Sequence, residues 1–468
     1  MKKFLLISLF LWPLLGFSQF PLDRLKTAFE NFEKDPQSHY GIQSICVLDA
    51  QTGKVLYAKN ENIGLATAST LKTITSATAL SLLGKDYRYQ TQLTYTGTID
   101  AQGVLHGDLI IEGGGDPSLG SWRFASTKEE IILQKMVAAI KQVGIRKIKG
   151  RIIGDDTLFG TQSLPSGWIW QDIGNYYGAG SGALNWRENQ FDVKLKPGAQ
   201  VGSPVQVLGT HPKMPYLSIS NELTTGLAGS GDNAYGYLGP FAQTAYLRGT
   251  WGIGINKAAI SLSSPEPAYD IAFRLKDSLE SLAFGEAMMV ETARRLAIAN
   301  ITLPQSRKII TTIESPKMSE LVYWFNQKSI NLYGEQMVKT IAYESGKKAT
   351  TENGVKAIID FWAAKGIDSK ALKMIDGSGL SPANRVTTLA MASILFQVQK
   401  ESWFPIFYES LPLYNGMKIK SGNINSVTAY AGYHTAKNGQ KYVVVINTNN
   451  YNGSGISQKL FQVLNILK

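Results

Sequence analysis

The chain has 468 residues, a length that fits roughly three domains, and its 44% hydrophobic and 18% charged residues are typical of a globular protein. The formal net charge is +11, but no basic cluster is interleaved with aromatic residues, so nucleic acid is not an expected partner. The single cysteine, Cys46, excludes an internal disulfide. The four scattered histidines supply no zinc-ligand set, and we expect neither a metal nor an organic cofactor.

The first 18 residues predict a signal peptide. Lys2 and Lys3 form a basic start, residues 4–17 form an apolar run, and cleavage is expected just after the small residue Ser18. The apolar run is too short to span a bilayer comfortably, and no later segment is apolar enough to do so. We therefore expect an exported, periplasmic protein with no transmembrane span in its mature chain.

Residues 19–90 predict the first part of an α/β domain. A leading helix is followed by strands at Ser44–Asp49 and Lys54–Lys59, and then by a buried helix that begins at Ser69. Residues 91–301 change in character, because glycine, turn signals and short strand-like runs dominate them, although Ala268–Ile301 is again helical in pattern. This region predicts a large β-rich insertion.

Residues 302–468 predict the second part of the same domain. The pattern indicates helices at Ser329–Glu344 and Thr351–Lys365, strands at Met417–Lys420, Val427–His434 and Lys441–Asn447, and a closing helix at Ser457–Ile466. The closing helix is somewhat amphipathic; a membrane anchor is one reading, and packing on the sheet is the preferred one. The fold class is thus α/β and multidomain, with a sheet built from both ends of the chain.

A Ser-x-x-Lys motif opens the helix at Ser69. Serine and lysine three positions apart share one helix face, and a hydroxyl in the first turn lies where N–H groups favour developing negative charge. Lys72 is therefore placed to take the proton of Ser69. A single match is weak, since about two are expected by chance in a chain of this length. The second match, at residues 345–348, is interpreted as a solvated turn.

Two further motifs give the first one weight. Ser329-Ile330-Asn331 precedes a helix, and Lys420-Ser421-Gly422 ends a strand. Ser-x-x-Lys, Ser-x-Asn and Lys-Ser/Thr-Gly, in that order, are expected of penicillin-recognising serine enzymes. A Ser-His-Asp hydrolase is disfavoured, because Gly-x-Ser-x-Gly is missing and no histidine lies beside a candidate nucleophile motif.

These residue types supply a serine nucleophile without histidine. Lys72 serves as the base if it is neutral, which burial and the second cation, Lys420, would favour. Ser329 can relay a proton to the leaving amine. Asn331 can hydrogen-bond Lys72 and the substrate amide.

The third motif supplies substrate contacts. Lys420 adds positive potential, and the Ser421 hydroxyl, followed by Gly422, can bind a terminal carboxylate. The backbone N–H groups of Ser69 and Asn423 would form the oxyanion hole.

With these motifs, the chain resembles the class C low-molecular-mass penicillin-binding proteins, which are D-alanyl-D-alanine carboxypeptidases/endopeptidases. The resemblance covers nearly the whole mature chain, and segments 113–119, 167–172 and 376–381 also match the family pattern. From Ser69 to Ser329 is 260 positions (329 − 69), whereas serine β-lactamases with this motif set have a much shorter interval. The resemblance implies a transpeptidase-like domain with an antiparallel sheet flanked by helices, interrupted by two β-rich modules.

The resemblance also implies a substrate and further site residues. Asp172 matches the carboxylate that meets the free amino group of the diaminopimelate stem residue, Tyr177 lines the same subsite, and Arg385 is a weaker candidate for the donor peptide. The expected ligands are peptidoglycan stem peptides, with β-lactams as inhibitors. The alternatives are a serine β-lactamase, or a non-catalytic peptidoglycan-binding or sensor protein on the same scaffold. Oligomeric state has no signature in the sequence.

Overall fold

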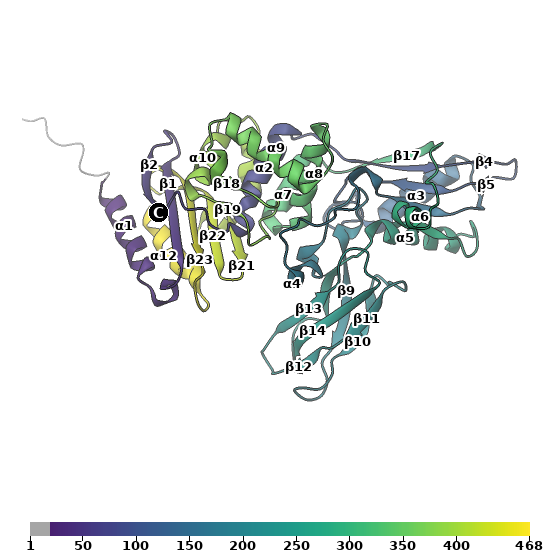
Figure 1. Cartoon of the computed structure of the whole chain (residues 1–468), viewed down its shortest axis with the longest axis horizontal. Helices are drawn as coiled ribbons and strands as arrows, with labels where there is room; N and C mark the ends of the chain where they lie inside the picture. Colours follow the sequence, from purple (N-terminus) through teal and green to yellow (C-terminus); the bar gives the residue numbers. More distant parts are fainter. Residues whose placement is uncertain (1–18) are drawn as a thin grey trace, which may run out of the picture.

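The computed structural model describes residues 19–468, so the predicted signal peptide lies outside the described residues. A helix-flanked sheet at one end of the molecule continues into two β-rich parts, one extending along the long axis and one projecting to the side (Figure 1).

Both ends of the chain build the main sheet. Its six strands run in the order β2-β1-β23-β22-β21-β20, and every neighbouring pair is antiparallel. β1 and β23, from opposite ends of the sequence, lie side by side. The strands are β1 (Ile42–Asp49), β2 (Val55–Lys59), β20 (Leu413–Tyr414), β21 (Met417–Ile424), β22 (Val427–Thr435) and β23 (Lys441–Asn449).

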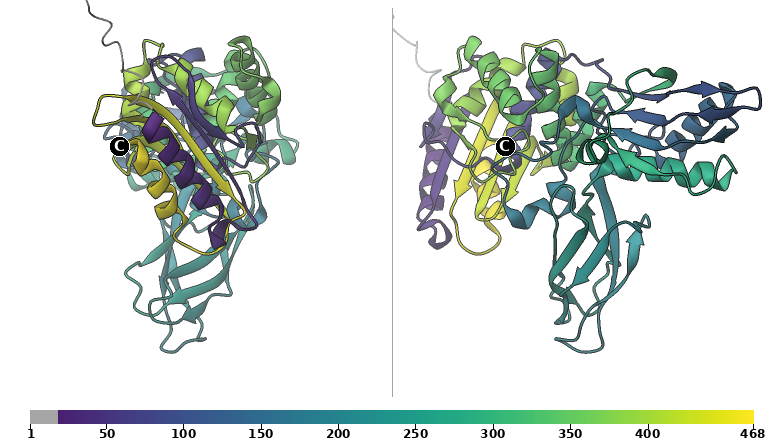
Figure 2. Two further views of the ribbon diagram at one scale, coloured as in Figure 1. Left: turned by 90° about the vertical axis from the view of Figure 1, so that its left-hand side faces the viewer. Right: turned by 45° about the vertical axis from the view of Figure 1, so that its right-hand side comes forward.

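Helices cover both faces of this sheet (Figures 1 and 2). Burial on two faces explains why the central strands read as nearly continuous apolar runs. One face packs on α1 (Gln19–Glu33) and α12 (Ile456–Leu464). The other packs on the larger core, which contains α2 (Lys72–Leu82), α7 (Met318–Lys328), α8 (Asn331–Glu344), α9 (Thr351–Ala364), α10 (Thr388–Val398) and α11 (Phe404–Ser410).

The part along the long axis contains a five-stranded sheet in the order β16-β8-β6-β3-β17. β3 leads out of the main domain and β17 leads back, and the two pair antiparallel, so the chain leaves and returns on neighbouring strands. The strands are β3 (Gln90–Tyr95), β6 (Leu109–Glu112), β8 (Ile152–Asp155), β16 (Val290–Thr292) and β17 (Lys308–Glu314). Around it lie α3 (Glu129–Gln142), α5 (Pro267–Ser281), α6 (Ala293–Ile298) and the short strands β4 (Thr98–Ile99), β5 (Val104–His106) and β7 (Lys147–Ile148).

The projecting part is built mainly of strands around its own apolar core. β9 (Gln190–Lys196) pairs with β10 (Gln206–His211) and β15 (Ala259–Ser263). β14 (Thr244–Gly252) pairs with β11 (Ser218–Asn221), β12 (Thr224–Gly226) and β13 (Asp232–Tyr237). The short helix α4 (Trp170–Ile173) lies at the top of β13, next to the main domain (Figure 1).

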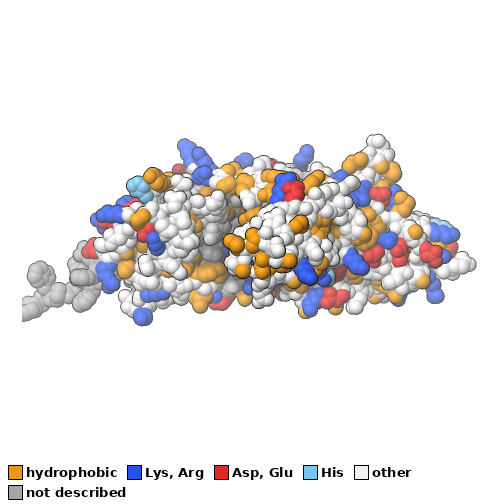
Figure 3. Space-filling view, turned by 90° about the horizontal axis from the view of Figure 1, so that it is seen from below, with side chains coloured by type: hydrophobic (Ala, Val, Ile, Leu, Met, Phe, Trp, Pro, Cys, Tyr) orange, Lys and Arg blue, Asp and Glu red, His pale blue; other side chains and the backbone are white. Residues whose placement is uncertain are grey.

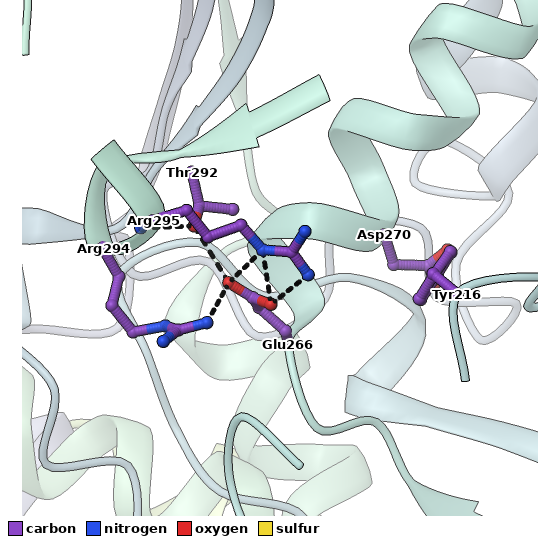
Figure 4. Close-up of polar contacts among 6 residues, drawn as sticks. All are labelled: Tyr216, Glu266, Asp270, Thr292, Arg294 and Arg295. Atoms are coloured by element: carbon purple, nitrogen blue, oxygen red, sulfur yellow. Dashed lines mark hydrogen bonds and ion pairs between the residues drawn. The ribbon is translucent and has the colours of Figure 1, made fainter. Parts of the chain in front are cut away.

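A buried carboxylate lies where the chain returns from the projecting part to the part along the long axis. Glu266 precedes α5 and accepts hydrogen bonds from Thr292 Oγ1 at 2.9 Å and from the guanidinium groups of Arg294 and Arg295 (Figure 4). Tyr216 reaches across from the projecting part and donates to Asp270 of α5 at 2.7 Å. Because the buried Glu266 carboxylate is satisfied by these donors and the Tyr216 hydroxyl bonds across to α5, the junction is specific rather than a flexible linker.

The expected α/β class with a helix-flanked antiparallel sheet is confirmed, and the structure corrects four predicted elements. The helix expected from Ser69 begins at Lys72, after a 3-10 turn that contains Ser69. Residues 268–301 are not one helical region: α5 ends at Ser281 and strand β16 pairs with β8 before α6 begins. Between α5 and β16, left-handed backbone at Ala283 and at Ala287 prevents the helix from continuing. The strand expected at 417–420 extends to Ile424, and the helix expected from Ser329 begins at Asn331. The domain boundaries at 90/91 and 301/302 stay predictions.

The closing helix packs on the sheet rather than standing free. Leu460 and Leu464 of α12 are fully buried against Leu25 and Phe29 of α1. Within residues 19–468, no helix has the length and apolar character that crossing a membrane requires.

The close packing of α8 against α9 gives a stability prediction. A Cβ added to Gly354 would lie 2.0 Å from the carbonyl oxygen of Val338, so Gly354→Ala must push two helices apart. We expect the unfolding free energy to fall by about 1–3 kcal/mol, measured by denaturant titration. The control is Lys356→Ala on the exposed side of α9, which removes only a surface ion pair with Asp360. Equal stability of the two variants would contradict this packing argument.

Candidate active site

The nucleophile candidate lies in a strained turn where the main sheet meets the helices. Ser69 belongs to a single 3-10 turn, Ala68–Leu71, and Lys72 begins α2 directly after it. Ala68 has left-handed backbone with φ 44°, a conformation that costs a non-glycine residue roughly 1–2 kcal/mol. The turn therefore presents the partly exposed Ser69 above a fully buried Lys72.

Three groups surround the Lys72 amine. Its Nζ lies 2.8 Å from Ser69 Oγ, 2.6 Å from Asn331 Oδ1 and 2.6 Å from the carbonyl oxygen of Ser378. The structure thus brings together Ser69, Lys72 and Asn331, as the motifs predicted. Ser378 is an addition that side-chain motifs did not reveal, because it acts through its backbone.

Two buried lysines share the centre. Burial, and secondly the charge of Lys420, hold the pKa of Lys72 well below its ordinary value. Burial also lowers the pKa of Lys420 from 10.5 to about 7. Lys420 is 1% exposed and donates to the Ser421 carbonyl at 2.7 Å. A neutral amine beside Ser69 is therefore electrostatically favoured.

The third motif lies in the middle of β21 rather than at a strand end. Gly422 faces the Ser69 turn so closely that an added Cβ would lie 2.7 Å from Thr67 O and 2.8 Å from Ser69 N. Only glycine allows this approach, which brings the strand carrying Ser421 and Asn423 against the nucleophile turn.

A buried carboxylate supports the Lys72 environment from below. Glu335 of α8 is fully buried and accepts hydrogen bonds from the backbone N–H groups of Gly377 and Ser378. It thereby fixes the turn whose carbonyl contacts Lys72. Burial and the neighbouring Asp376 raise the pKa of Glu335. Four positions after Asn331, Glu335 lies on the same face of α8.

Ser69 opens into a cleft of about 730 Å³ between the main domain and the projecting part. Ser329, Asn331, Asn423, Asp172 and Tyr177 also line it. Viewed from below, the molecule shows a furrow between these two parts (Figure 3).

Each predicted substrate-contact residue has a definite position. Ser329 follows α7 in left-handed backbone with φ 56° and faces the cleft. The Asn331 amide donates to Tyr177 O at 2.7 Å, which ties the insertion to α8. Burial raises the pKa of Asp172, which the Tyr177 hydroxyl partly opposes. Arg385 is exposed, donates to the carbonyls of Pro382 and Asn384, and is not among the residues that line the cleft.

The fold and the motif geometry define a penicillin-recognising serine enzyme. The model of the D-Ala-D-Ala carboxypeptidase 3 (S13) family matches residues 25–465, and the chain belongs to this family. It is a serine-type D-Ala-D-Ala carboxypeptidase of the penicillin-binding class. Among residues 19–468, no group of three or more histidine, cysteine or acidic side chains could hold a metal ion.

Curated relatives agree with this placement, and a solved structure shares the fold. The chain is 27% identical over 462 residues to a D-alanyl-D-alanine carboxypeptidase of Actinomadura sp. strain R39, covering 91% of this chain and 81% of that protein. It is 24% identical to the Haemophilus influenzae carboxypeptidase DacB, covering 86% and 84% respectively. The crystal structure of penicillin-binding protein 4 from H. influenzae matches with a TM-score of 0.77 at 20% identity, over 93% of this chain and 97% of that one.

Burying the Lys420 amine makes the folded protein less stable, and this effect depends on pH. Between pH 7 and 10.5 the unfolded chain binds more protons at this residue than the folded chain, so stability rises with pH in that window. We expect Lys420→Met to raise the unfolding free energy at pH 7 by about 2 kcal/mol, with the gain shrinking toward pH 10.5. Thermal unfolding across this range measures the effect. Lys418→Met, on the same strand but paired with Glu409, should show no such trend. A variant destabilised at pH 7 would contradict the prediction.

Proposed function

We propose that the chain removes the terminal D-Ala of peptidoglycan stem peptides through an acyl-enzyme on Ser69. The observation that carries this mechanism is the set of partners around Lys72 Nζ. A neutral amine has two N–H donors and one lone pair. The Asn331 oxygen and the Ser378 carbonyl take the two donors, which leaves the lone pair for the Ser69 hydroxyl 2.8 Å away.

The reaction steps follow from this arrangement. Ser69 Oγ attacks the carbonyl of the penultimate D-Ala while its proton passes to Lys72 Nζ. The N–H groups of Ser69 and Asn423 stabilise the oxyanion, and Ser329 relays a proton to the departing amine of the terminal D-Ala. Water then attacks the ester, which releases the shortened peptide and restores the Ser69 hydroxyl.

The third motif gives the site its preference for a free carboxylate. Protonated Lys420 supplies positive potential, and the Ser421 hydroxyl donates to the terminal carboxylate of the substrate. Without substrate, Lys420 has a pKa of about 7, close to neutral pH. A bound carboxylate favours the charged form of this amine. β-Lactams, which also carry a carboxylate beside a reactive carbonyl, acylate the same serine in this proposal.

The same site is proposed to cleave D-Ala-diaminopimelate cross-links, with Asp172 meeting the free amino group of diaminopimelate beside Tyr177. Both residues lie on the cleft wall contributed by the insertion. Arg385 stays a weaker candidate for the donor peptide, since it does not line the cleft and its guanidinium is engaged with the carbonyls of Pro382 and Asn384. The proposal also places the mature chain in the periplasm, where the predicted signal peptide would direct it.

A β-lactamase is disfavoured by Glu335. A deacylating base must reach a water beside the acyl-serine, whereas Glu335 is fully buried and its carboxylate accepts backbone N–H groups of Gly377 and Ser378. Rapid turnover of penicillin by the purified protein would reverse this ranking.

Fluorescent penicillin tests the nucleophile. Ser69→Ala should abolish covalent labelling, because the attacking oxygen is missing, and should release no D-Ala from a pentapeptide substrate. The matched control is Ser345→Ala, which removes the serine of the second Ser-x-x-Lys sequence in an exposed turn. Labelling of the Ser69→Ala protein at the wild-type level would show that another residue is acylated.

Asp172→Asn tests the amine subsite. The neutral amide keeps the shape but loses the charge, so kcat/KM for a stem peptide with a free diaminopimelate amine should fall about tenfold or more. The same peptide with that amine acetylated should react equally with both proteins, as measured by released D-Ala. An equal loss on the two peptides would argue for a structural role of Asp172 instead.

A further inference from the structure

One face of the β13–β14 ribbon carries aromatic side chains next to the active-site cleft. Tyr237 is paired with Tyr246, and Tyr235 with Arg248, in the antiparallel register. Residues two apart on a strand share a face, so these four side chains lie on the same side of the ribbon. Trp170 of α4 packs on Tyr237 with ring centroids 6.1 Å apart. We call Trp170, Tyr235, Tyr237, Tyr246 and Arg248 the aromatic face.

The aromatic face is continuous with the catalytic cleft. Tyr235 lines the cleft together with Tyr176 and Tyr177, while Tyr237 and Tyr246 extend the same face onto the projecting part. Figure 3 shows hydrophobic side chains gathered on the projecting part beside the furrow. A substrate bound at Ser69 therefore has a path along this face.

The rings are exposed to a degree that the fold does not require. Trp170 is 54% exposed and Tyr246 is 43% exposed, although the projecting part has a well-buried core of its own. A contiguous exposed patch of this kind marks a binding surface more often than a scattered surface residue does.

Arg248 completes the face as a positioned donor. Its Nε donates to Glu222 at 3.0 Å, and its guanidinium lies over the rings of Tyr237 and Tyr246 at 5.2 and 6.0 Å. The side chain is half exposed, so part of its donor fork faces solvent. Flat rings beside a fixed polar donor suit a ligand that has both C–H faces and hydroxyl groups.

We propose that the aromatic face binds the polysaccharide strand to which the stem peptides are attached. A sugar ring presents C–H groups of partial positive charge, which pack on the negative face of an aromatic ring, while its hydroxyl and amide oxygens accept from Arg248. The inference rests on the proposed function, because a stem peptide held at Ser69 brings its own strand to the edge of the cleft. The aromatic face then strengthens the binding of polymeric substrate and leaves the binding of free peptide unchanged.

Tyr246→Ala tests this binding, because Tyr246 lies outside the cleft. Sedimentation with purified sacculi, and with peptide-free glycan strands, should show binding weakened about fivefold. Tyr246→Phe keeps the ring and should restore it. The matched control is Tyr40→Ala, another strongly exposed tyrosine, which lies before β1 in the main domain and should bind like the wild type.

Activity separates this proposal from the proposed function. Tyr246→Ala should keep wild-type penicillin labelling and wild-type release of D-Ala from a soluble pentapeptide, but digest intact sacculi more slowly. Unchanged binding to both sacculi and glycan strands would overturn the glycan assignment while leaving the peptidase assignment intact. Weaker binding to sacculi alone would also overturn it, since the face would then recognise peptide. Wild-type protein that labels with penicillin but releases no D-Ala would instead count against the proposed function.

Discussion

The arrangement of the main domain depends on burying the amine of Lys72 without an acidic partner in contact with it. Its Nζ is held by its own turn, by Asn331 at a separation of 259 residues and by Ser378 at a separation of 306. Such an environment exists only when the segments before and after the insertion are packed together. Two local features make that packing possible: the left-handed backbone of Ala68 and the missing side chain of Gly422. Each lets backbone approach the Ser69 turn closely.

The motif side chains could be predicted from the sequence because each group of them is local in the chain. Ser69 and Lys72 share one turn, and Ser329 and Asn331 flank one helix start. The Ser378 carbonyl and the supporting role of Glu335 could not be predicted, since a backbone acceptor has no residue signature and a lone glutamate in a helix has many uses. Strand β16 was missed for a related reason: it is short, and pairing with β8 rather than its own pattern defines it.

The insertion also contributes residues to the cleft beside Ser69. It leaves and returns on the paired strands β3 and β17, so the main domain closes as though the chain were continuous. It then returns to the cleft through Tyr177, whose carbonyl accepts from the Asn331 amide at 2.7 Å. Asn331 therefore contacts Lys72 with its oxygen and the insertion with its nitrogen. Asn331 is thus one side chain through which movement of the insertion would reach Lys72.

Helix α8 extends this coupling along its length. Asn331, Glu335 and Lys339 are spaced by four residues and form one buried polar stripe of α8, beside the buried polar residues Gln336 and Thr340. The first contacts Lys72, the second fixes the turn at Gly377, and the third donates to the carbonyls of Gln162 and Ser181 in the insertion. Burying these three side chains is unfavourable unless each is satisfied. Their partners come from both sides of the cleft, so the folded stability of α8 and the geometry around Lys72 depend on the same contacts.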